Sequence, residues 1–189
     1  MICVRIISGE KKGFSVKAVP GMNTRPTTDK IRESMFQIIG PRFEGGTMLD
    51  LYGGSGVVGL EALSRGMDKV IFVDKSPSAV QTIKNNLRAA GWAARAEVYR
   101  NESYLALKAV SRKGYQFEMI FLDPPYEKHN LQKDLEFISE KQLLKTGGIV
   151  IVEHARKVIL PETYENLYME RRENYGITTI SIYREGEAE

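Results

Sequence analysis

From residue 47 onward, short apolar, β-rich runs alternate with segments of helical periodicity. The runs at 70–73 and 149–152 are continuously apolar, as expected for strands that are covered by helices on both faces. Such alternation predicts an α/β fold built on a doubly wound, mostly parallel sheet. We expect strands at 47–52, 69–74, 95–100, 118–123 and 148–153, and helices between them at 56–65, 76–90, 102–112 and 130–145.

The end of the chain departs from this alternation. The strand-like segments 166–173 and 177–184 are separated by Asn174-Tyr175-Gly176 rather than by a helix, which predicts a closing antiparallel hairpin. Local signals support the helix boundaries further upstream. Ser76-Pro77 is typical of a helix start, Gly91 is expected to close that helix, and Gly147-Gly148 is expected to close the last one.

The start of the chain also differs from the repeating pattern. Strand-like runs at 4–7 and 14–16 flank a Gly/Lys turn, and 27–39 is typical of a capped helix. We therefore expect a small extension, residues 1–46, that faces the substrate. An α/β domain over 47–189 would follow it.

Composition excludes several classes of protein. A length of 189 residues suits one domain with a sizeable core. No apolar run approaches the roughly 20 residues that cross a bilayer, and the amino terminus lacks the apolar segment of a signal peptide. The single cysteine, Cys3, excludes an internal disulfide, and His129 and His154 have no zinc-ligand spacing. We expect a cytoplasmic protein with neither a membrane segment nor a metal.

Positive charge is concentrated in the first 32 residues. They hold seven Lys or Arg against two acidic residues, a net +5, so the other residues carry −2 of the chain's total of +3. Nucleic acid is the expected partner of such a segment, although a solvated hairpin would have the same composition. Two further pairs, Arg156-Lys157 and Arg171-Arg172, could contact phosphates or form ordinary surface, and the sequence leaves their role open.

The first predicted strand runs into a glycine-rich turn at 53–59. The stretch from Gly54 to Gly59 spells G-x-G-x-x-G, and Asp74 ends the second predicted strand. This is formally a dinucleotide-binding fingerprint, which keeps a nicotinamide enzyme among the alternatives. Asp74 would bind ribose hydroxyls with either class of ligand, unless it serves only to cap the helix that begins at Ser76.

Asp50, just before that turn, favours a different ligand. A carboxylate there would repel a pyrophosphate but attract a cationic ligand, directly or through water. S-adenosylmethionine is such a ligand, because it has no phosphate and carries an ammonium group and a sulfonium. The alternative is that Asp50 merely caps the turn. Asn101-Glu102 follow the third predicted strand, where an adenine ring would be bordered, although Asn101 also suits the N-cap of the next helix.

The run Asp123-Pro124-Pro125-Tyr126 directly follows the apolar strand that is expected at 118–123. The prolines fix their own φ angles and bias the preceding residues toward extended geometry, so the carbonyls of Asp123 and Pro124 have set directions. That carboxylate and a rigid carbonyl can accept the two N–H bonds of a planar amino group, and the Tyr126 ring can stack on a nucleobase. The pattern indicates methylation of a base amine.

Together, the segment 50–56, Asp74 and the tetrapeptide at 123–126 resemble the Rossmann-like class I amino-methyltransferases. The segment 25–36, Arg-Pro-Thr-Thr-Asp-Lys-Ile-Arg-Glu-Ser-Met-Phe, with 5–9 and 12–13 ahead of it, is similar to the RsmD-type 16S rRNA guanine-N2 methyltransferases of bacteria. This resemblance covers essentially the whole chain. The Asp-Pro-Pro-Tyr motif is shared by many methylases, whereas the Arg-Pro-Thr-Thr-Asp segment is the more specific element.

The resemblance implies methylation of the exocyclic N2 amine of a guanine, at position 966 in the usual numbering of bacterial 16S rRNA. The substrate would be an assembled or partly assembled small subunit, and the product of the cofactor would be S-adenosylhomocysteine. Our default expectation for the oligomeric state, apart from the resemblance, is a monomer. The expected catalytic residues are Asp123, Pro124, Pro125 and Tyr126; the cofactor residues are Asp50, Tyr52, Gly53, Gly54, Ser55, Gly56, Asp74, Lys75, Asn101 and Glu102; and the RNA-contacting residues are Arg5, Lys11, Lys12, Arg25, Thr27 and Arg32.

Other functions remain open on the sequence alone. An amino-methyltransferase of this kind could act on adenine in DNA or RNA, on a different rRNA guanine, or on a glutamine side chain. A ribosome-assembly factor could use the same fold mainly to bind rRNA, but the intact glycine turn and the carboxylate Asp123 favour catalysis.

Overall fold

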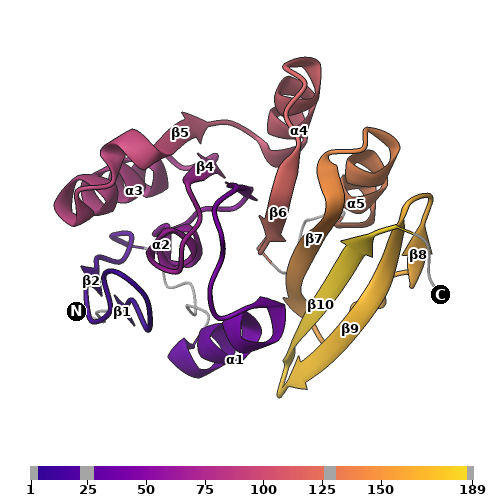
Figure 1. Ribbon diagram of the computed structural model, residues 1–189, viewed down its shortest axis with the longest axis horizontal. Coiled ribbons are helices and arrows are strands. Elements are labelled where there is room, and N and C mark those ends of the chain that lie inside the picture. Colours follow the sequence, from indigo (N-terminus) through magenta and orange to yellow (C-terminus); the bar gives the residue numbers. More distant parts are fainter. Residues whose placement is uncertain (1–3, 22–27, 126–130, 187–189) are drawn as a thin grey trace. The chain divides into compact units, whose positions relative to one another are not determined.

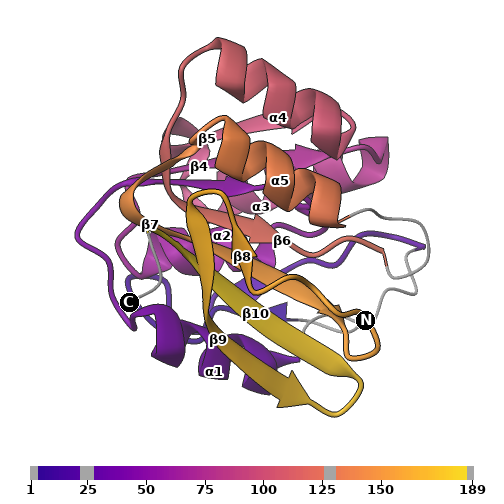
Figure 2. The ribbon, with the colours of Figure 1, turned by 90° about the vertical axis from the view of Figure 1, so that its right-hand side faces the viewer.

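The computed structural model describes residues 4–21, 28–125 and 131–186, and the chain divides into two compact units, 1–101 and 102–189. Figures 1 and 2 show the helices and strands of each unit. Among the described residues, no helix combines the length and the apolarity that crossing a membrane requires.

The first unit contains a parallel three-stranded sheet. Its strands are β3 (Thr47–Asp50), β4 (Lys69–Asp74) and β5 (Ala96–Arg100), in the order β5-β4-β3. The connections between them are α2 (Val57–Ser64), α3 (Pro77–Ala90) and a short 3-10 turn at Ala93–Arg95. All three strands lie where the apolar runs of the sequence predict them, and the side chains of β3 and β4 form much of this unit's core.

Helix α3 shows why the predicted boundaries hold. The Ser76 hydroxyl accepts a hydrogen bond from the amide of Ala79 at 3.4 Å, and Pro77 occupies the first turn. Gly91 ends the helix in the left-handed conformation, with φ of 73°. These are the N-cap, first-turn and C-cap preferences that the sequence displays.

The amino-terminal segment belongs to this unit. It contains the short hairpin β1 (Val4–Arg5) and β2 (Ser15–Val16), followed by α1 (Asp29–Ile39), whose N-cap is Thr28. The turn of the hairpin lies on α2: the amides of Glu10 and Lys11 donate to the carbonyl and hydroxyl of Ser64, at 2.8 and 2.9 Å. A side chain at Gly9 would lie 1.8 Å from the Ser64 carbonyl oxygen, so only glycine fits there.

A buried carboxylate joins this extension to α2. Glu61 accepts the backbone amides of Ile7 and Ser8, at 2.8 and 3.0 Å. Its oxygens also lie 2.8 Å from Nε of Arg65 and 3.7 Å from Nε of Arg32. The extension is therefore held by a charged, fully buried cluster, in which loss of one member leaves the others without compensation.

The second unit begins with α4 (Ser103–Arg112) and contains α5 (Leu131–Glu140). Its strands lie in the order β6-β7-β10-β9-β8. Strands β6 (Phe117–Leu122) and β7 (Leu144–Ala155) are parallel, whereas β8 (Thr163–Tyr164), β9 (Leu167–Tyr175) and β10 (Thr178–Glu185) add antiparallel pairs. The closing hairpin predicted from the sequence is present, and the two-residue strand β8 was not predicted.

One predicted boundary in this unit is wrong. The helix expected to reach residue 145 ends at Glu140, and β7 begins at Leu144 rather than at 148. Gln142 has a positive φ of 48°, which breaks the helix before the glycines are reached. Gly147 and Gly148 instead lie inside β7, where the register against β6 shifts. Paired glycines in a strand are typical of such an irregularity as well as of a helix end.

Candidate cofactor and amine sites

Asp50 is the last residue of β3 and is buried, with 1% of its surface exposed. Neither of its carboxylate oxygens has a hydrogen-bond partner among the described residues. Burial raises the pKa of Asp50 to about 7, and the nearby Asp74 carboxylate adds to that rise. The amides of Gly59 and Tyr52 lie close enough to oppose it in part, although neither forms a hydrogen bond of normal geometry. A partnerless buried carboxylate is costly, so its position calls for a ligand.

The turn after β3 is fixed by backbone hydrogen bonds. The Gly53 amide donates to the carbonyl of Val73 at 2.8 Å, and the Gly56 amide donates to the Gly53 carbonyl at 2.7 Å. Gly54 and Gly56 have positive φ angles of 55° and 83°. Side chains at these positions would be strained by the backbone conformation, which explains the glycines.

The space around the turn differs from one glycine to the next. A Cβ at Gly53 would lie 2.7 Å from Cδ1 of Ile83, so this face of the turn packs against α3. A Cβ at Gly54 would meet nothing within 4 Å, so the turn has an open face at this position. The open face leaves room for a ligand to approach the backbone closely.

Asp74 closes the turn from the end of β4. Its two oxygens accept the amides of Gly54 and Ser76, at 2.9 and 2.8 Å. Each carboxylate oxygen has two acceptor positions, so hydroxyl groups of a ligand can still bind there. The N-cap of α3 is Ser76, so Asp74 does not cap that helix as the alternative interpretation proposed.

A site with these properties fits S-adenosylmethionine better than a dinucleotide. Asp50 and Asp74 lie close enough to repel each other, as the raised pKa of Asp50 indicates. A pyrophosphate would add further negative charge to this place, whereas an ammonium group would supply the missing partner of Asp50. The fit rests on the two buried carboxylate oxygens of Asp50, which have no hydrogen-bond partner among the described residues.

The other expected cofactor residues lie at the ends of the same strands. Tyr52 and Ser55 are half-buried in the turn, and Lys75 is exposed directly after Asp74. The Asn101 amide donates to the Asp74 carbonyl at 3.1 Å. Glu102, which begins the second unit, is the N-cap residue of α4, so the capping role considered for Asn101 falls to its neighbour.

Asn86 is a residue of this site that the sequence interpretation missed. Its side chain donates to the carbonyls of Ser55 and Lys17, each at 3.0 Å, and accepts the Lys17 amide at 3.0 Å. It therefore links the glycine turn to the amino-terminal extension. The available signal was its place on the apolar face of α3, next to Leu87, where a buried polar side chain requires a partner.

Asp123 and the prolines follow the end of β6 in the second unit. Asp123 is half-buried, Pro124 is buried and Pro125 is exposed. The last residue of β6, Leu122, pairs with Val152 of β7, so the carboxylate begins where the parallel pair ends. Carboxyl ends of parallel strands are the usual place for ligands in α/β folds. Tyr126, the expected stacking residue, lies outside the described residues.

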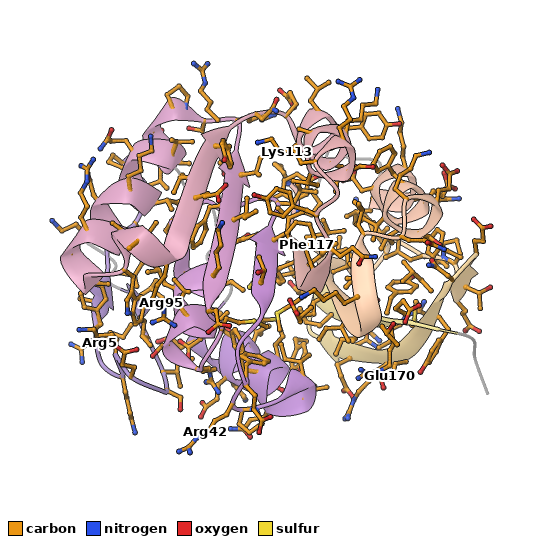
Figure 3. All side chains as sticks on the ribbon, turned by 45° about the horizontal axis from the view of Figure 1, so that its top comes forward. Arg5, Arg42, Arg95, Lys113, Phe117 and Glu170 are labelled. Carbon is orange, nitrogen blue, oxygen red and sulfur yellow. The ribbon has the colours of Figure 1, made fainter. Side chains whose placement is uncertain are left out.

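The expected RNA contacts give a mixed result. The Arg5 side chain is exposed (Figure 3), as is that of Lys12, whereas Lys11 is half-buried. Arg25 and Thr27 lie outside the described residues.

Arg32 requires a correction. Its side chain is fully buried, and Nη2 donates to the Arg5 carbonyl at 2.5 Å and to Asp29 at 3.1 Å. Because these contacts and Glu61 enclose it, Arg32 does not line a base entrance but joins the extension to α2. Residues that end up buried cannot be told from surface cations by counting charge.

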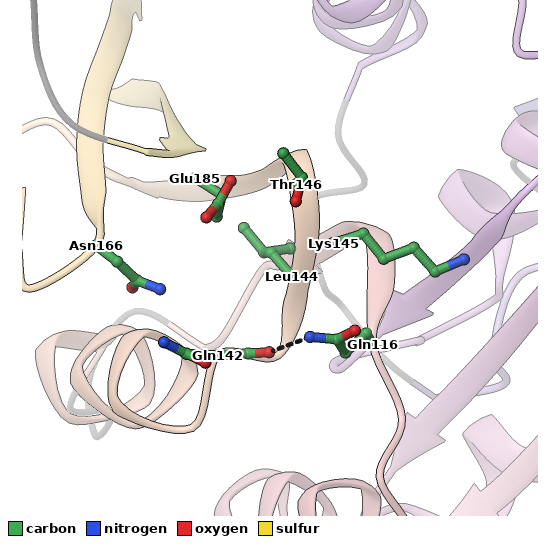
Figure 4. A pocket seen from close by; sticks show the side chains of 7 residues that line it. All are labelled: Gln116, Gln142, Leu144, Lys145, Thr146, Asn166 and Glu185. Carbon is green, nitrogen blue, oxygen red and sulfur yellow. Dashed lines mark hydrogen bonds between the residues drawn. The ribbon is translucent and has the colours of Figure 1, made fainter.

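A polar hollow of about 460 Å³ lies elsewhere in the second unit (Figure 4). Gln116 precedes β6, Leu144 and Lys145 begin β7, and Glu185 ends β10. These positions lie at the end of the sheet where β6 and β7 begin, whereas Asp123 follows the opposite end, where β6 ends. Two of its side chains are already hydrogen-bonded to backbone: Gln116 Nε2 donates to the Gln142 carbonyl, and Glu185 accepts the Gly147 amide. We assign it no part in the proposed chemistry.

Comparison with known proteins agrees with the fold and the motifs. The family model described as "Conserved hypothetical protein 95" matches residues 4–184. The YlbH protein of Bacillus subtilis (strain 168) is 50% identical over 181 residues, which cover 96% of this chain and 98% of that protein. The ribosomal RNA small subunit methyltransferase D of Buchnera aphidicola subsp. Acyrthosiphon pisum is 31% identical over 90% of this chain and 88% of its own.

A solved structure of the Escherichia coli protein yhhF superposes with a TM-score of 0.82. It is 26% identical and covers 98% of this chain and 99% of its own. The likeness confirms the predicted fold class, an α/β, Rossmann-like fold with a mostly parallel sheet and a closing antiparallel hairpin.

Proposed function

Because this chain belongs to the family described as conserved hypothetical protein 95, of the RsmD type, we propose that it is an S-adenosylmethionine-dependent rRNA methyltransferase. Its target in this proposal is the exocyclic N2 amine of a guanine in small-subunit rRNA, at position 966 as the family resemblance implies. The observation that carries the proposal is the buried Asp50 carboxylate beside the open face of the glycine turn. The name of the Buchnera relative supports rRNA as the class of substrate.

In this proposal the cofactor binds at the residues that follow β3, β4 and β5. Asp50 receives the ammonium group, the backbone at Gly54 allows close approach, and Asp74 accepts ribose hydroxyls. Asn101 and Glu102 border the adenine ring. The bound cofactor supplies an electrophilic methyl group on a sulfonium.

The residues after β6 hold the amine. A guanine amine is a poor nucleophile, because its lone pair is delocalised into the ring. Asp123 and the Pro124 carbonyl accept its two N–H bonds, which favours a pyramidal nitrogen and stabilises positive charge as it develops there. As the nitrogen–carbon bond forms, the carbon–sulfur bond breaks and its electron pair stays on sulfur. The extra proton leaves nitrogen afterwards, so no covalent enzyme intermediate is required.

Stacking and charge complete the substrate site. Tyr126 stacks on the splayed-out base, a contact worth about 1 to 3 kcal/mol by alanine substitution. Arg5, Lys11 and Lys12 contact phosphates, and Arg25 and Thr27 line the base entrance. We further propose a monomer that acts on an assembled or partly assembled small subunit in the cytoplasm and uses no metal.

The test is methyl transfer from isotope-labelled S-adenosylmethionine to unmodified small subunits, naked small-subunit rRNA and duplex DNA, with identification of the methylated nucleoside by mass spectrometry. Label in N2-methylguanosine is expected. Label in methyladenine would keep the amine chemistry and reject the guanine.

The variant Asp123→Asn tests the orienting role separately. It keeps the shape of the side chain, so RNA binding and cofactor binding should be retained while methyl transfer falls at least 100-fold. A variant that binds both partners and retains near-normal transfer would show that Asp123 does not orient the amine.

A further inference from the structure

Two exposed turns of the second unit form a surface that the proposed function has not used. We call it the basic tip: Arg156, Lys157 and Ile159 after β7, with Ile177 between β9 and β10. Ile159 and Ile177 are 86% and 66% exposed. The two turns are joined by a hydrogen bond from the Arg156 amide to the Ile177 carbonyl at 2.8 Å. The two turns therefore bring exposed aliphatic side chains and two exposed cations to one region of the unit.

The basic tip lies at the same end of the sheet as Asp123, the end at which β6 and β7 terminate. Strand β6 ends at Leu122, opposite Val152, but β7 continues for three more residues to Ala155, which pairs with Thr178. At about 3.3 Å per residue, β7 extends about 10 Å beyond the end of β6. Figure 1 shows the β9–β10 turn beyond the end of β6. A base held at Asp123 would therefore have its neighbouring nucleotides within reach of the basic tip.

Within the described residues of the unit, no carboxylate pairs with the charges of the basic tip. On the adjoining hairpin, Arg171 lies 2.6 Å from Glu173, so these two charges offset each other. Arg156 and Lys157 are exposed and form no ion pair with any residue in the described parts of the chain. Arg172, whose Nη2 donates to the Leu160 carbonyl at 3.2 Å, adds a third positive charge without a carboxylate partner in those parts. This distribution suits a polyanion.

We propose that the basic tip binds the rRNA strand next to the target base, an inference that rests on the proposed function. Arg156 and Lys157 contact the flanking phosphates. Ile177 packs against a base that loses its stacking neighbour when the guanine is splayed out, as apolar side chains do where proteins unstack nucleic acid. The basic tip thus holds open the loop from which the base is taken.

The chain offers a matched control for the two cations. Arg112 and Lys113 form another exposed Arg-Lys pair in the same unit, at the carboxyl end of α4 (Figure 3 labels Lys113). The chain passes from this pair into the start of β6 at Phe117, the strand end opposite to Asp123. The double variants Arg156→Gln/Lys157→Gln and Arg112→Gln/Lys113→Gln therefore remove the same charge from the two opposite ends of the strands.

The experiment measures binding of the full-length protein to unmodified small-subunit rRNA between 0.1 and 1 M salt. Two lost phosphate contacts should flatten the slope of log affinity against log salt by about 1.4. The factor by which the variant binds more weakly than the wild type should therefore be about 25 times larger at 0.1 M salt than at 1 M. The control variant should keep the slope of the wild type. Cofactor binding and the urea midpoint of each variant verify that the fold is intact.

Ile177→Ser tests the apolar part, since the residue is exposed and the change leaves the charge unaltered. Methyl transfer should fall about tenfold, with an unchanged salt slope and unchanged cofactor affinity. Transfer at the wild-type rate would refute the packing of Ile177 against a base.

The outcomes separate this inference from the proposed function. If the wild type methylates rRNA but the Arg156/Lys157 variant has the salt slope of the wild type or of the control, the basic tip does not bind RNA. If that variant binds naked rRNA normally and fails only on assembled subunits, the surface meets a ribosomal protein and the inference is wrong. A wild type that methylates no RNA would refute the proposed function itself.

Discussion

The substitution Asp50→Asn should stabilise the protein in the absence of cofactor while it abolishes cofactor binding. Asparagine keeps the size of the side chain but removes a buried charge that has no hydrogen-bond partner in the described structure. Binding sites are often less stable than they could be, because groups that await a ligand are left unsatisfied. We expect Asp50 to be such a group.

The size of the effect follows from the pKa of Asp50. Burial raises that pKa from 3.8 to about 7. Each pKa unit corresponds to about 1.4 kcal/mol, so the ionised form is disfavoured in the folded state by about 4 kcal/mol. Because the folded-state pKa is above the unfolded value, this destabilisation is absent below about pH 4, grows as the pH rises, and is complete above about pH 7. The stability gained by Asp50→Asn should follow the same course.

Urea unfolding at pH 4.5, 5.5, 6.5 and 8 measures the difference directly. The control is Glu44→Gln, which removes the same charge from an exposed position in the same unit and should change stability by less than about 0.5 kcal/mol. A gain of about 4 kcal/mol at pH 8 that shrinks to about 1 kcal/mol at pH 4.5 is expected, less the penalty of burying the new amide. A gain that does not vary with pH, or a loss at pH 8, would show that Asp50 is not a strained buried anion.

Three further outcomes follow. Affinity for S-adenosylmethionine should fall by up to tenfold per pH unit below about pH 7, since its ammonium group needs ionised Asp50. Titration calorimetry that gave the same affinity at every pH between 5.5 and 8 would exclude that contact. Gly59→Ala places a Cβ 2.3 Å from the Phe72 ring and should lower the free energy of unfolding in urea by about 1 to 3 kcal/mol. Gly54→Ala, which is strained only in φ, should lower it by about 1 to 2 kcal/mol but should also abolish cofactor binding. If both variants changed cofactor binding equally, the open face at Gly54 would be contradicted. Glu61→Gln should destabilise by about 3 to 5 kcal/mol and expose Lys11 and Lys12 to trypsin, and a protease-resistant extension would show that another contact holds it.

Much of the fold could be predicted from local chemistry. The apolar runs of β3, β4 and β6 identified buried strands, and the Ser76 and Gly91 signals fixed both ends of α3. The error at Gly147-Gly148 has a definite cause. Paired glycines can end a helix or interrupt a strand, and what decided between them was the pairing of β7 with β6, a contact between distant segments.

The candidate site shows the same contrast between local signals and contacts made by distant segments. Asp50 and Asp74 stand at strand ends, so sequence position alone was enough to propose both as ligand contacts. Asn86 could not be assigned in that way, because its role arises from two carbonyls, those of Ser55 and Lys17, that are 31 and 69 residues away in the chain.

The amino-terminal extension shows why charge must be followed to its partner before it is assigned to a substrate. Arg32 contributes to the net +5 of the first 32 residues, yet its charge is enclosed with Glu61, while Glu10 pairs with Arg95 at 3.2 Å. Charge that is compensated inside the fold adds little to the attraction of a polyanion. Arg156 and Lys157 meet this criterion as the exposed cations Arg5 and Lys12 do, since they are exposed and have no carboxylate partner in the described ranges. By that reasoning, a basic pair in the less basic part of the chain is available to a polyanion.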